Sequence, residues 1–252
     1  MSMGRIHPSH PQHELEPKNH SGSPYTCSGC RMQGFGKRHG CEYCDYVLHE
    51  DCMFPATHPI RHPFFGNSTF KFLYQPEPTG GERYCDACGK PIYGFNYHCR
   101  KKEGDWDLHP CCSKLKDQLL IDGVKFRLCD KVSSGCHWCN RRHIQHGVSG
   151  VRGWSYVSRC SKYRFHVHCV SEMMQEGWRR AGGMAGRDDG DALAIERIEL
   201  STLSAGGRNG SGRYKENKYW RMVKIFLRTV VGILFGDPSA VVAAFMADLI
   251  AN

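Results

Sequence analysis

The chain has 252 residues, a formal net charge of +9, and 15 cysteines beside 15 histidines, both far above ordinary usage. Its length allows one or two ordinary domains, or several small ones. Residues Met1 to His10 are polar and contain no apolar run, so no secretory signal is visible. Disulfides rarely persist in the reducing cytosol or nucleus, and an odd cysteine count with abundant histidine favours metal binding over a disulfide framework. We therefore expect a zinc protein of the cytoplasm or nucleus.

The ligand pattern that organises the chain lies between residues 27 and 52. It reads Cys27-x2-Cys30-x10-Cys41-x2-Cys44-x4-His49-x2-Cys52. Zinc takes four thiolate or imidazole ligands at tetrahedral corners, and each Cys-x2-Cys turn presents two thiolates, so each pair supplies half a site. The economical arrangement is interleaved, with Cys27 and Cys30 joining His49 and Cys52. The remaining pair, Cys41 and Cys44, would take two more histidines from either side.

A Cys-x2-Cys pair followed by a His-x2-Cys pair returns twice along the chain, which indicates an internal repeat. The second set of ligands is Cys85, Cys88, His109 and Cys112, and the third is Cys136, Cys139, His166 and Cys169. Short apolar runs at Phe70 to Tyr74 and Val124 to Cys129 come before the later sets and predict strands.

Units of this size, about 50 residues, bury too little apolar surface to fold without help. Structural zinc contributes on the order of 10–16 kcal/mol of apparent binding free energy, against a typical net domain stability of about 5–15 kcal/mol. The predicted fold class is therefore small zinc-stabilised α+β modules in tandem, with short antiparallel strands and cross-braced zinc sites, followed by an α-helical C-terminal tail. The predicted boundaries are 10–65, 66–120 and 121–178 for the three zinc modules, 179–217 for a flexible linker with a short helix, and 218–252 for an amphipathic and apolar helical hairpin.

Residues 10 to 178 resemble the plant cysteine/histidine-rich proteins with divergent C1 (DC1) domains, relatives of the diacylglycerol and phorbol-ester zinc domain. The phrases that carry the resemblance are Tyr25-Thr26-Cys27-Ser28-Gly29-Cys30, Leu48-His49-Glu50-Asp51-Cys52, Tyr84-Cys85-Asp86-Ala87-Cys88 and Leu108-His109-Pro110-Cys111-Cys112. The family pattern implies an upstream His and a downstream His or Cys that complete the second site of module one. In this sequence these are His13 and His62, with His10 and His58 as neighbours that could replace them.

The later modules depart from that pattern. Lys102 stands where module two needs a partner thiol for Cys99, so its second site is expected to be empty. Module three keeps only Cys129 and Cys160 near its second site, and whether these two thiols, or Cys99 and Cys111, touch metal stays open. We expect about four structural zinc ions, two in module one and one in each later module.

Two other classes of thiol protein fit the sequence less well. A histone-reading zinc finger shares the order of the first six ligands, but Arg83 stands where such a finger usually has Trp, and Cys85 and Cys88 restart a complete new pattern. A thiol–disulfide enzyme needs its Cys-x2-Cys pair in a strand–turn–helix setting, and the βαβ periodicity of such a fold is absent.

The C-terminal third differs in composition. The range 208–228 holds seven Lys or Arg against one acid, Glu216, and so supplies +6 of the net charge of +9. The rest of the chain is therefore close to neutral, which argues against nucleic acid as a partner. Helices are predicted at Ala192 to Leu203 and at Tyr219 to Phe235. In the second range, apolar residues recur every three to four positions. Asp237-Pro238 predicts the start of another apolar helix, Ser239 to Ile250. The apolar run is too short to span a bilayer.

The most economical function is a zinc-organised interaction or signalling adaptor without catalysis, which recognises a protein partner. The C-terminal helices would support self-association or packing on the modules, and residues 213–252 offer a peripheral attachment to a membrane surface. The alternatives are a thiol–disulfide enzyme of the protein-disulfide reductase type and a lipid or membrane-surface sensor. For the latter, Phe35, between two glycines, is either a lipid-inserting loop tip or the buried aromatic of a small module.

Overall fold

The computed structural model describes residues 4–78, 81–102, 104–130, 132, 134–144, 151–180 and 218–236. Within this part of the chain, three antiparallel four-stranded sheets follow one another, each built from four consecutive strands in chain order. The first holds β1 (Arg5–His7), β2 (His10–Thr26), β3 (Gln33–Gly40) and β4 (Val47–Leu48). The second holds β5 (Ile60–Arg61), β6 (Thr69–Leu73), β7 (Asn96–Cys99) and β8 (Trp106–Leu108). The third holds β9 (Gln118–Ile121), β10 (Val124–Cys129), β11 (Ser155–Ser158) and β12 (Arg164–His166).

The helices are few and stand between or after the sheets. They are the short α1 (Glu50–Met53), the 3₁₀ turns η1 (Pro63–Phe65) and η2 (Cys112–Lys114), and the longer α2 (Val167–Arg180) and α3 (Lys218–Phe235). The expected antiparallel modules are present, and the strands expected near residues 70–74 and 124–129 are β6 and β10. The predicted helices at Ala192 to Leu203 and Ser239 to Ile250 lie outside the described residues. No helix in the described ranges combines the length and the apolar character needed to cross a membrane.

Two module boundaries differ from those expected from the sequence. Ile60 of β5 pairs with Phe70 of β6, so β5 belongs to the second sheet although residue 60 was assigned to module one. At the other end, the first sheet already begins at Arg5, because β1 pairs with β2 across a register shift. Strands of two or three residues leave no periodic pattern, so only their pairing reveals them.

Local sequence sets the geometry of the third sheet. In β10, Phe126 and Leu128 are buried whereas Lys125 and Arg127 are exposed, which is the alternation expected of a strand with one covered face. The β9–β10 hairpin turns at Asp122-Gly123, where both residues have positive φ (46° and 77°). An Asp-Gly pair favours this type of two-residue turn because glycine has no Cβ and Asp tolerates the left-handed region.

The modules dock through backbone contacts at their metal-binding turns. The carbonyl of Gly29, between Cys27 and Cys30, accepts a hydrogen bond from Phe95 of module two (3.0 Å), and the carbonyl of Ala87 accepts one from Trp154 of module three (2.8 Å). The approach is close: a Cβ added at Gly94 would lie 2.0 Å from the Gly29 oxygen. Each later module therefore places a Gly-aromatic pair on the turn of the module before it.

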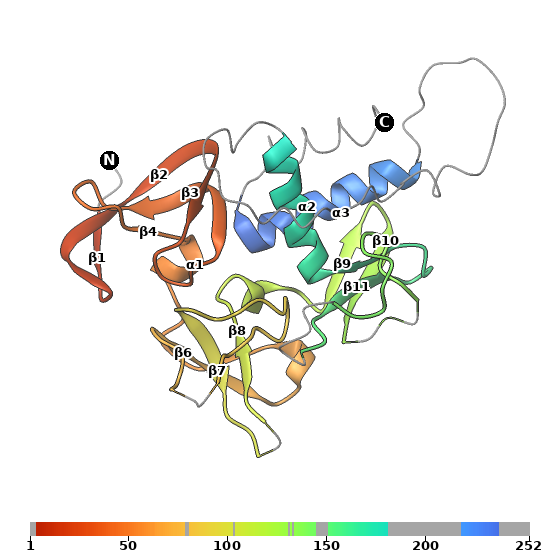
Figure 1. The fold of residues 1–252 in the computed structure, drawn as a ribbon, viewed down its shortest axis with the longest axis horizontal. Helices are drawn as coiled ribbons and strands as arrows, with labels where there is room; N and C mark the ends of the chain where they lie inside the picture. The colour runs from red at the N-terminus through yellow and green to blue at the C-terminus, as the bar shows by residue number, and fades with distance from the viewer. Residues whose placement is uncertain are drawn as a thin grey trace.

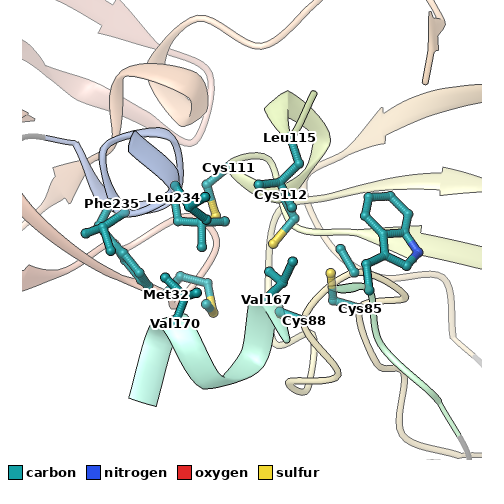
Figure 2. Close-up of a cluster of buried hydrophobic side chains, with 14 of the residues drawn as sticks. Met32, Cys85, Cys88, Cys111, Cys112, Leu115, Val167, Val170, Leu234 and Phe235 are labelled. Atoms are coloured by element: carbon teal, nitrogen blue, oxygen red, sulfur yellow. The ribbon is translucent and has the colours of Figure 1, made fainter. Parts of the chain in front are cut away.

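Helix α3 completes the interior that the modules share. Figure 1 shows it running between the first sheet and the third, with α2 beside it. Of the apolar residues that the 3–4 spacing singles out, Val223, Leu227, Val230 and Leu234 are buried, and so are Met222, Phe226, Val231 and Phe235 beside them. The ring of Phe226 stacks on Phe126 and Phe165 at centroid distances of 4.8 and 5.1 Å. In Figure 2, Leu234 and Phe235 reach the end of α2 and the sulfur of Cys111, so one apolar core connects all three modules.

Candidate metal centres

Four groups of cysteine and histidine converge in the part of the chain that the structure describes. They are Cys27, Cys30, His49 and Cys52; His10, His13, Cys41 and Cys44; Cys85, Cys88, His109 and Cys112; and Cys136, Cys139, His166 and Cys169. In each group the four candidate ligand atoms all lie within 4.8 Å of one another. All 15 cysteines are free of disulfides, and the four clusters suit about four zinc ions.

The same turn builds the Cys-x2-Cys pair of the first cluster in every module. The N–H of the first cysteine bonds to a carbonyl five residues later, as Cys27 does to Met32 and Cys85 to Lys90, both at 2.9 Å. The residue just after the second cysteine has positive φ: 63° at Arg31, 68° at Gly89 and 56° at Asn140. This local turn brings the two sulfurs to one side, which is why the Cys-x2-Cys spacing alone was enough to predict half of each site.

The distances within the clusters are those of ligands around a shared ion. The Sγ of Cys30 lies 3.3 Å from Nδ1 of His49, and the corresponding distance is 3.4 Å for Cys88 and His109 and 3.3 Å for Cys139 and His166. A tetrahedral zinc with bonds of about 2.3 Å to sulfur and about 2.0 Å to nitrogen requires sulfur–nitrogen edges of about 3.5 Å. The observed spacing is close to that value, so a zinc ion fits without rearrangement of the backbone.

The histidine rings are oriented for this role by their second nitrogen. Nε2–H of His49 donates to the carbonyl of Gln33 (3.2 Å), and Nε2–H of His109 donates to the carbonyl of Pro91 (3.1 Å). A hydrogen bond at Nε2 fixes the tautomer and leaves the lone pair of Nδ1 facing the sulfurs, as in many zinc sites. In His166, Nε2 is buried without a hydrogen-bond partner, while Nδ1 faces Cys139 in the same way.

The pKa values of the cluster ligands show which of them hold a proton when no metal is bound. Burial raises the pKa of the Cys30 thiol to about 11, and hydrogen bonding to the Cys136 and Cys139 sulfurs raises the pKa of Cys169 far above its ordinary value. Burial lowers the pKa of His166, but hydrogen bonds to Cys136 and Cys139 outweigh it and raise that pKa to about 10. Cys30, Cys169 and His166 therefore retain protons that a bound zinc ion would displace, because zinc binds the thiolate and the neutral ring. Hydrogen bonds from neighbouring cysteines instead lower the pKa of Cys136 and, against the effect of burial, that of Cys27.

The second cluster of module one differs from the expected ligand set at one position. The structure brings His10 together with His13, Cys41 and Cys44, and it places His62 elsewhere. The Sγ of Cys44 lies 3.3 Å from Nδ1 of His13, and Nε2 of His10 is buried with no hydrogen-bond partner, as expected of a nitrogen that faces a metal. The expectation that His62 completes this site is wrong.

His62 instead joins module two to module three. It precedes η1 and is buried, with Nε2–H donating to the carbonyl of Leu115 (2.6 Å) and Nδ1 accepting from the N–H of Phe64 (3.2 Å). Its ring lies 4.9 Å from that of Trp154. Both nitrogens are occupied, so no lone pair remains for a metal. Sequence reasoning could have found His10 from the His-x2-His spacing of His10 and His13, which mirrors Cys-x2-Cys.

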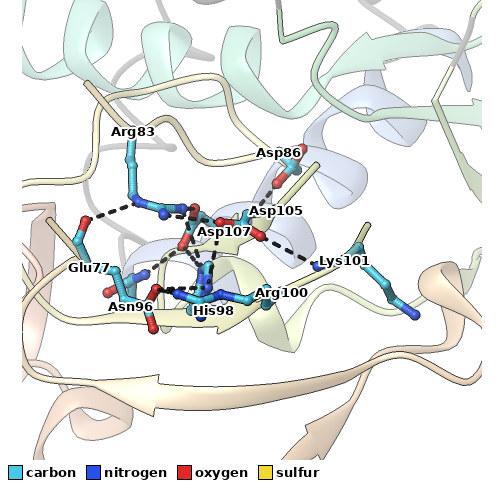
Figure 3. A network of polar contacts seen from close by, with 9 residues as sticks. All are labelled: Glu77, Arg83, Asp86, Asn96, His98, Arg100, Lys101, Asp105 and Asp107. Carbon is cyan, nitrogen blue, oxygen red and sulfur yellow. Dashed lines mark hydrogen bonds and ion pairs between the residues drawn. The ribbon is translucent and has the colours of Figure 1, made fainter. Parts of the chain in front are cut away.

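The leftover thiols take no part in these clusters among the described residues. Cys99 and Cys111 are buried, Cys129 is half-buried and Cys160 is exposed. Beside Cys99, module two contains a network of ion pairs and hydrogen bonds in which Arg83 and His98 both contact Asp107, at 2.5 and 3.0 Å (Figure 3). Charged side chains that are paired in this way stabilise the strands β7 and β8 without a second metal.

Comparison with known proteins supports the assignment for the first module. Residues 8–53 match a family model described as C1 domain. The matched range contains all eight residues of the two clusters of module one and ends before His62, so residues 8–53 are a C1-type zinc domain. No curated protein and no solved structure matches the chain.

Proposed function

We propose that the chain is a zinc-organised, non-catalytic interaction adaptor of the divergent C1 kind, in which the metals hold the fold and the surface does the recognition. The observation that carries this proposal is the ligand count. Each cluster offers four protein ligands, and structural zinc sites are closed in this way, whereas catalytic zinc sites keep a position for water or substrate. The surface that recognises a partner would then lie outside the metal centres.

The thiol–disulfide alternative conflicts with the position of the sulfurs. A redox dithiol must be accessible as a thiolate, but both cysteines of the Cys27 and Cys85 pairs are buried beside an imidazole and a further thiol. Zinc thiolates in such clusters are poor exchangers because the metal withdraws charge from sulfur. Nothing in the described clusters favours an enzyme over a structural centre.

A lipid-binding loop around Phe35 is also disfavoured by its surroundings. Phe35 is only 1% exposed, and its ring meets that of Phe235 edge-on at 6.1 Å. The backbone beside it pairs with Gly236, just after the end of α3. The apolar side of α3 is buried as well, so membrane attachment through that side of α3 would require the helix to leave the modules.

Recognition of a protein partner fits the exposed aromatic residues better. Tyr43 is 80% exposed beside the second cluster, and Tyr93 is 67% exposed in module two. Exposed tyrosines supply large contact area at little entropic cost and are enriched among the residues that dominate binding energy. The proposed setting is the cytoplasm or nucleus. Because α3 packs on the modules, the proposed route to self-association is the helix expected at Ser239 to Ile250, which lies outside the described residues.

The decisive experiment measures thiol reactivity and turnover on the same sample. The native protein is titrated with a thiol reagent before and after addition of a strong chelator, and it is assayed for reduction of an insulin disulfide. We expect most thiols to react only after chelation, with release of about four zinc ions and no reductase turnover. Rapid reaction of one Cys-x2-Cys pair in the zinc-loaded protein, with turnover, would establish the enzyme instead.

A further inference from the structure

The positive charge of the folded chain is concentrated in module three. Module three, residues 121–178, holds nine Lys or Arg and four Asp or Glu, a net of +5, whereas residues 1–120 hold fourteen against thirteen. Outside 208–228 the net charge is therefore not evenly spread: module three carries +5, and the acids of 179–207 and 229–252 exceed the bases there by three.

The third sheet gathers part of this charge on its solvent face. Lys125 and Arg127 alternate with buried residues along β10 and point away from α3. Arg159, just after β11, donates its N–H to the carbonyl of Lys125 (2.7 Å), which places it on the neighbouring strand. Residues two apart on a strand are about 7 Å apart and neighbouring strands about 4.8 Å, so these three exposed cations form one compact patch. Lys162 is also exposed, in the loop that follows.

These cations have no acidic partners in the described structure. Some exposed basic side chains elsewhere are paired, as Lys114 is with Asp51 and Arg221 with Asp122. Others, such as Lys37 and Lys71, are not paired within the described ranges. The patch differs from these in holding three cations on adjacent positions of one sheet face. Among the described residues, neither Lys125, Arg127, Arg159 nor Lys162 takes part in an ion pair. Unpaired like charges held together on a rigid sheet repel one another, and an anionic surface would relieve that repulsion.

An aliphatic residue stands directly beside the patch. Leu120 of β9 pairs with Lys125 and is 69% exposed, and half-buried Val157 of β11 pairs with Arg127. Every exposed large aromatic residue in the described chain lies in module one or two, so a nucleic-acid strand would find no ring on this face for its bases to stack on. A leucine among cations is instead the arrangement that lets apolar atoms enter the headgroup region while Lys and Arg meet anionic lipid.

We propose that the outer face of the third sheet, formed by Leu120, Lys125, Arg127 and Arg159, binds an anionic phospholipid membrane surface. This site is separate from the metal clusters and from Phe35, and it requires no movement of α3. The proposal does not depend on the adaptor function, although it would give an adaptor a place to act.

The test is co-sedimentation of the full zinc-loaded chain with vesicles of phosphatidylcholine, with and without phosphatidylserine. We expect binding only to the vesicles that contain phosphatidylserine. Each cation near an anionic surface contributes about fivefold in affinity, so the variant K125Q/R127Q/R159Q should bind on the order of 100-fold more weakly. The matched control K37Q/K71Q/K102Q removes three exposed cations from modules one and two, and it should bind at most a few-fold more weakly.

Two further measurements keep the result interpretable. Zinc content of about four in both triple variants shows that they are folded, and the single variant Leu120→Ser, on an exposed side chain, should bind several-fold more weakly to the same vesicles. Equal losses in the two triple variants would overturn the site, because net charge alone would then explain the binding. Absence of wild-type binding to phosphatidylserine would also overturn it, as would Leu120-independent binding of a DNA duplex in preference to vesicles.

Discussion

The two clusters of module one use similar ligands but stand in different surroundings. Cys27, Cys30, His49 and Cys52 are all buried, and the turn between the first two docks against module two. In the second cluster Cys44 is exposed and His13 is half-buried, at the edge where β2 begins. The buried cluster therefore takes the place of a hydrophobic core in module one, whereas the second cluster holds together the edge of the first sheet where β2 begins. The number of ligands is the same, but the amount of structure that depends on them differs.

The largest effect is expected from removing a ligand of the buried cluster. In Cys27→Ser, zinc binding on the order of 10–16 kcal/mol is lost or severely weakened at a site that holds the module together. We expect module one to unfold and zinc content to fall from about four to about two, as measured by mass spectrometry with circular dichroism. A variant that keeps three zinc ions and an unchanged unfolding temperature would show that this cluster is no more central than its neighbour.

The next effect concerns the contact beneath the same cluster. In Gly94→Ala the new Cβ would lie 2.0 Å from the Gly29 carbonyl oxygen, a backbone atom with little freedom to move. Overpacking of this kind costs about 1–3 kcal/mol or more, and we expect it to separate modules one and two while all four zinc ions remain. Chemical unfolding and limited proteolysis measure the change. Gly81→Ala is the control, because a Cβ there meets nothing within 4 Å.

A smaller effect is expected at the exposed cluster. Cys44→Ser and His10→Ala should each lower zinc content from about four to about three, and modules two and three should keep their stability. The matched control is His62→Ala, which should keep all four zinc ions although it costs about 1–3 kcal/mol through the hydrogen bond lost to the buried Leu115 carbonyl. If His62→Ala lost zinc and His10→Ala did not, the ligand assignment would be reversed.

The smallest effect is the pH dependence of zinc retention. The raised pKa of Cys30, about 11, means that its thiol is protonated at neutral pH until zinc displaces the proton. Zinc binding therefore releases protons, and affinity decreases as pH falls. We expect acidification to empty the exposed second cluster before the buried ones, seen as a step from four to three in a chelator-dye titration. Calorimetry in buffers of different ionisation enthalpy measures the protons released, and a single step for all four ions would contradict the ranking.

Most of the metal centres could be predicted from spacing, because a Cys-x2-Cys turn is a local structure. The hydrogen bonds of that turn and its positive-φ residue span six positions, so Cys85 and Cys88 are placed by their immediate neighbours. Spacing predicts His62 wrongly, because the role of this histidine depends on Leu115 and Trp154, which lie far away in the chain. His10, by contrast, carries a local signal, because it lies three residues before His13, which is the spacing of the cysteines within each pair.

The sequence by itself determined the ligands that come in close pairs, the antiparallel strands with clear alternation, and the helix at 218–235. Only the tertiary structure decided that α3 lies in the shared interior and that Phe35 is covered by its end. It also decided which cations of module three face solvent together. The physical reason is the range of the interactions: a turn or a helix is stabilised within a few residues, whereas burial and charge clustering depend on segments that meet only after the chain has folded.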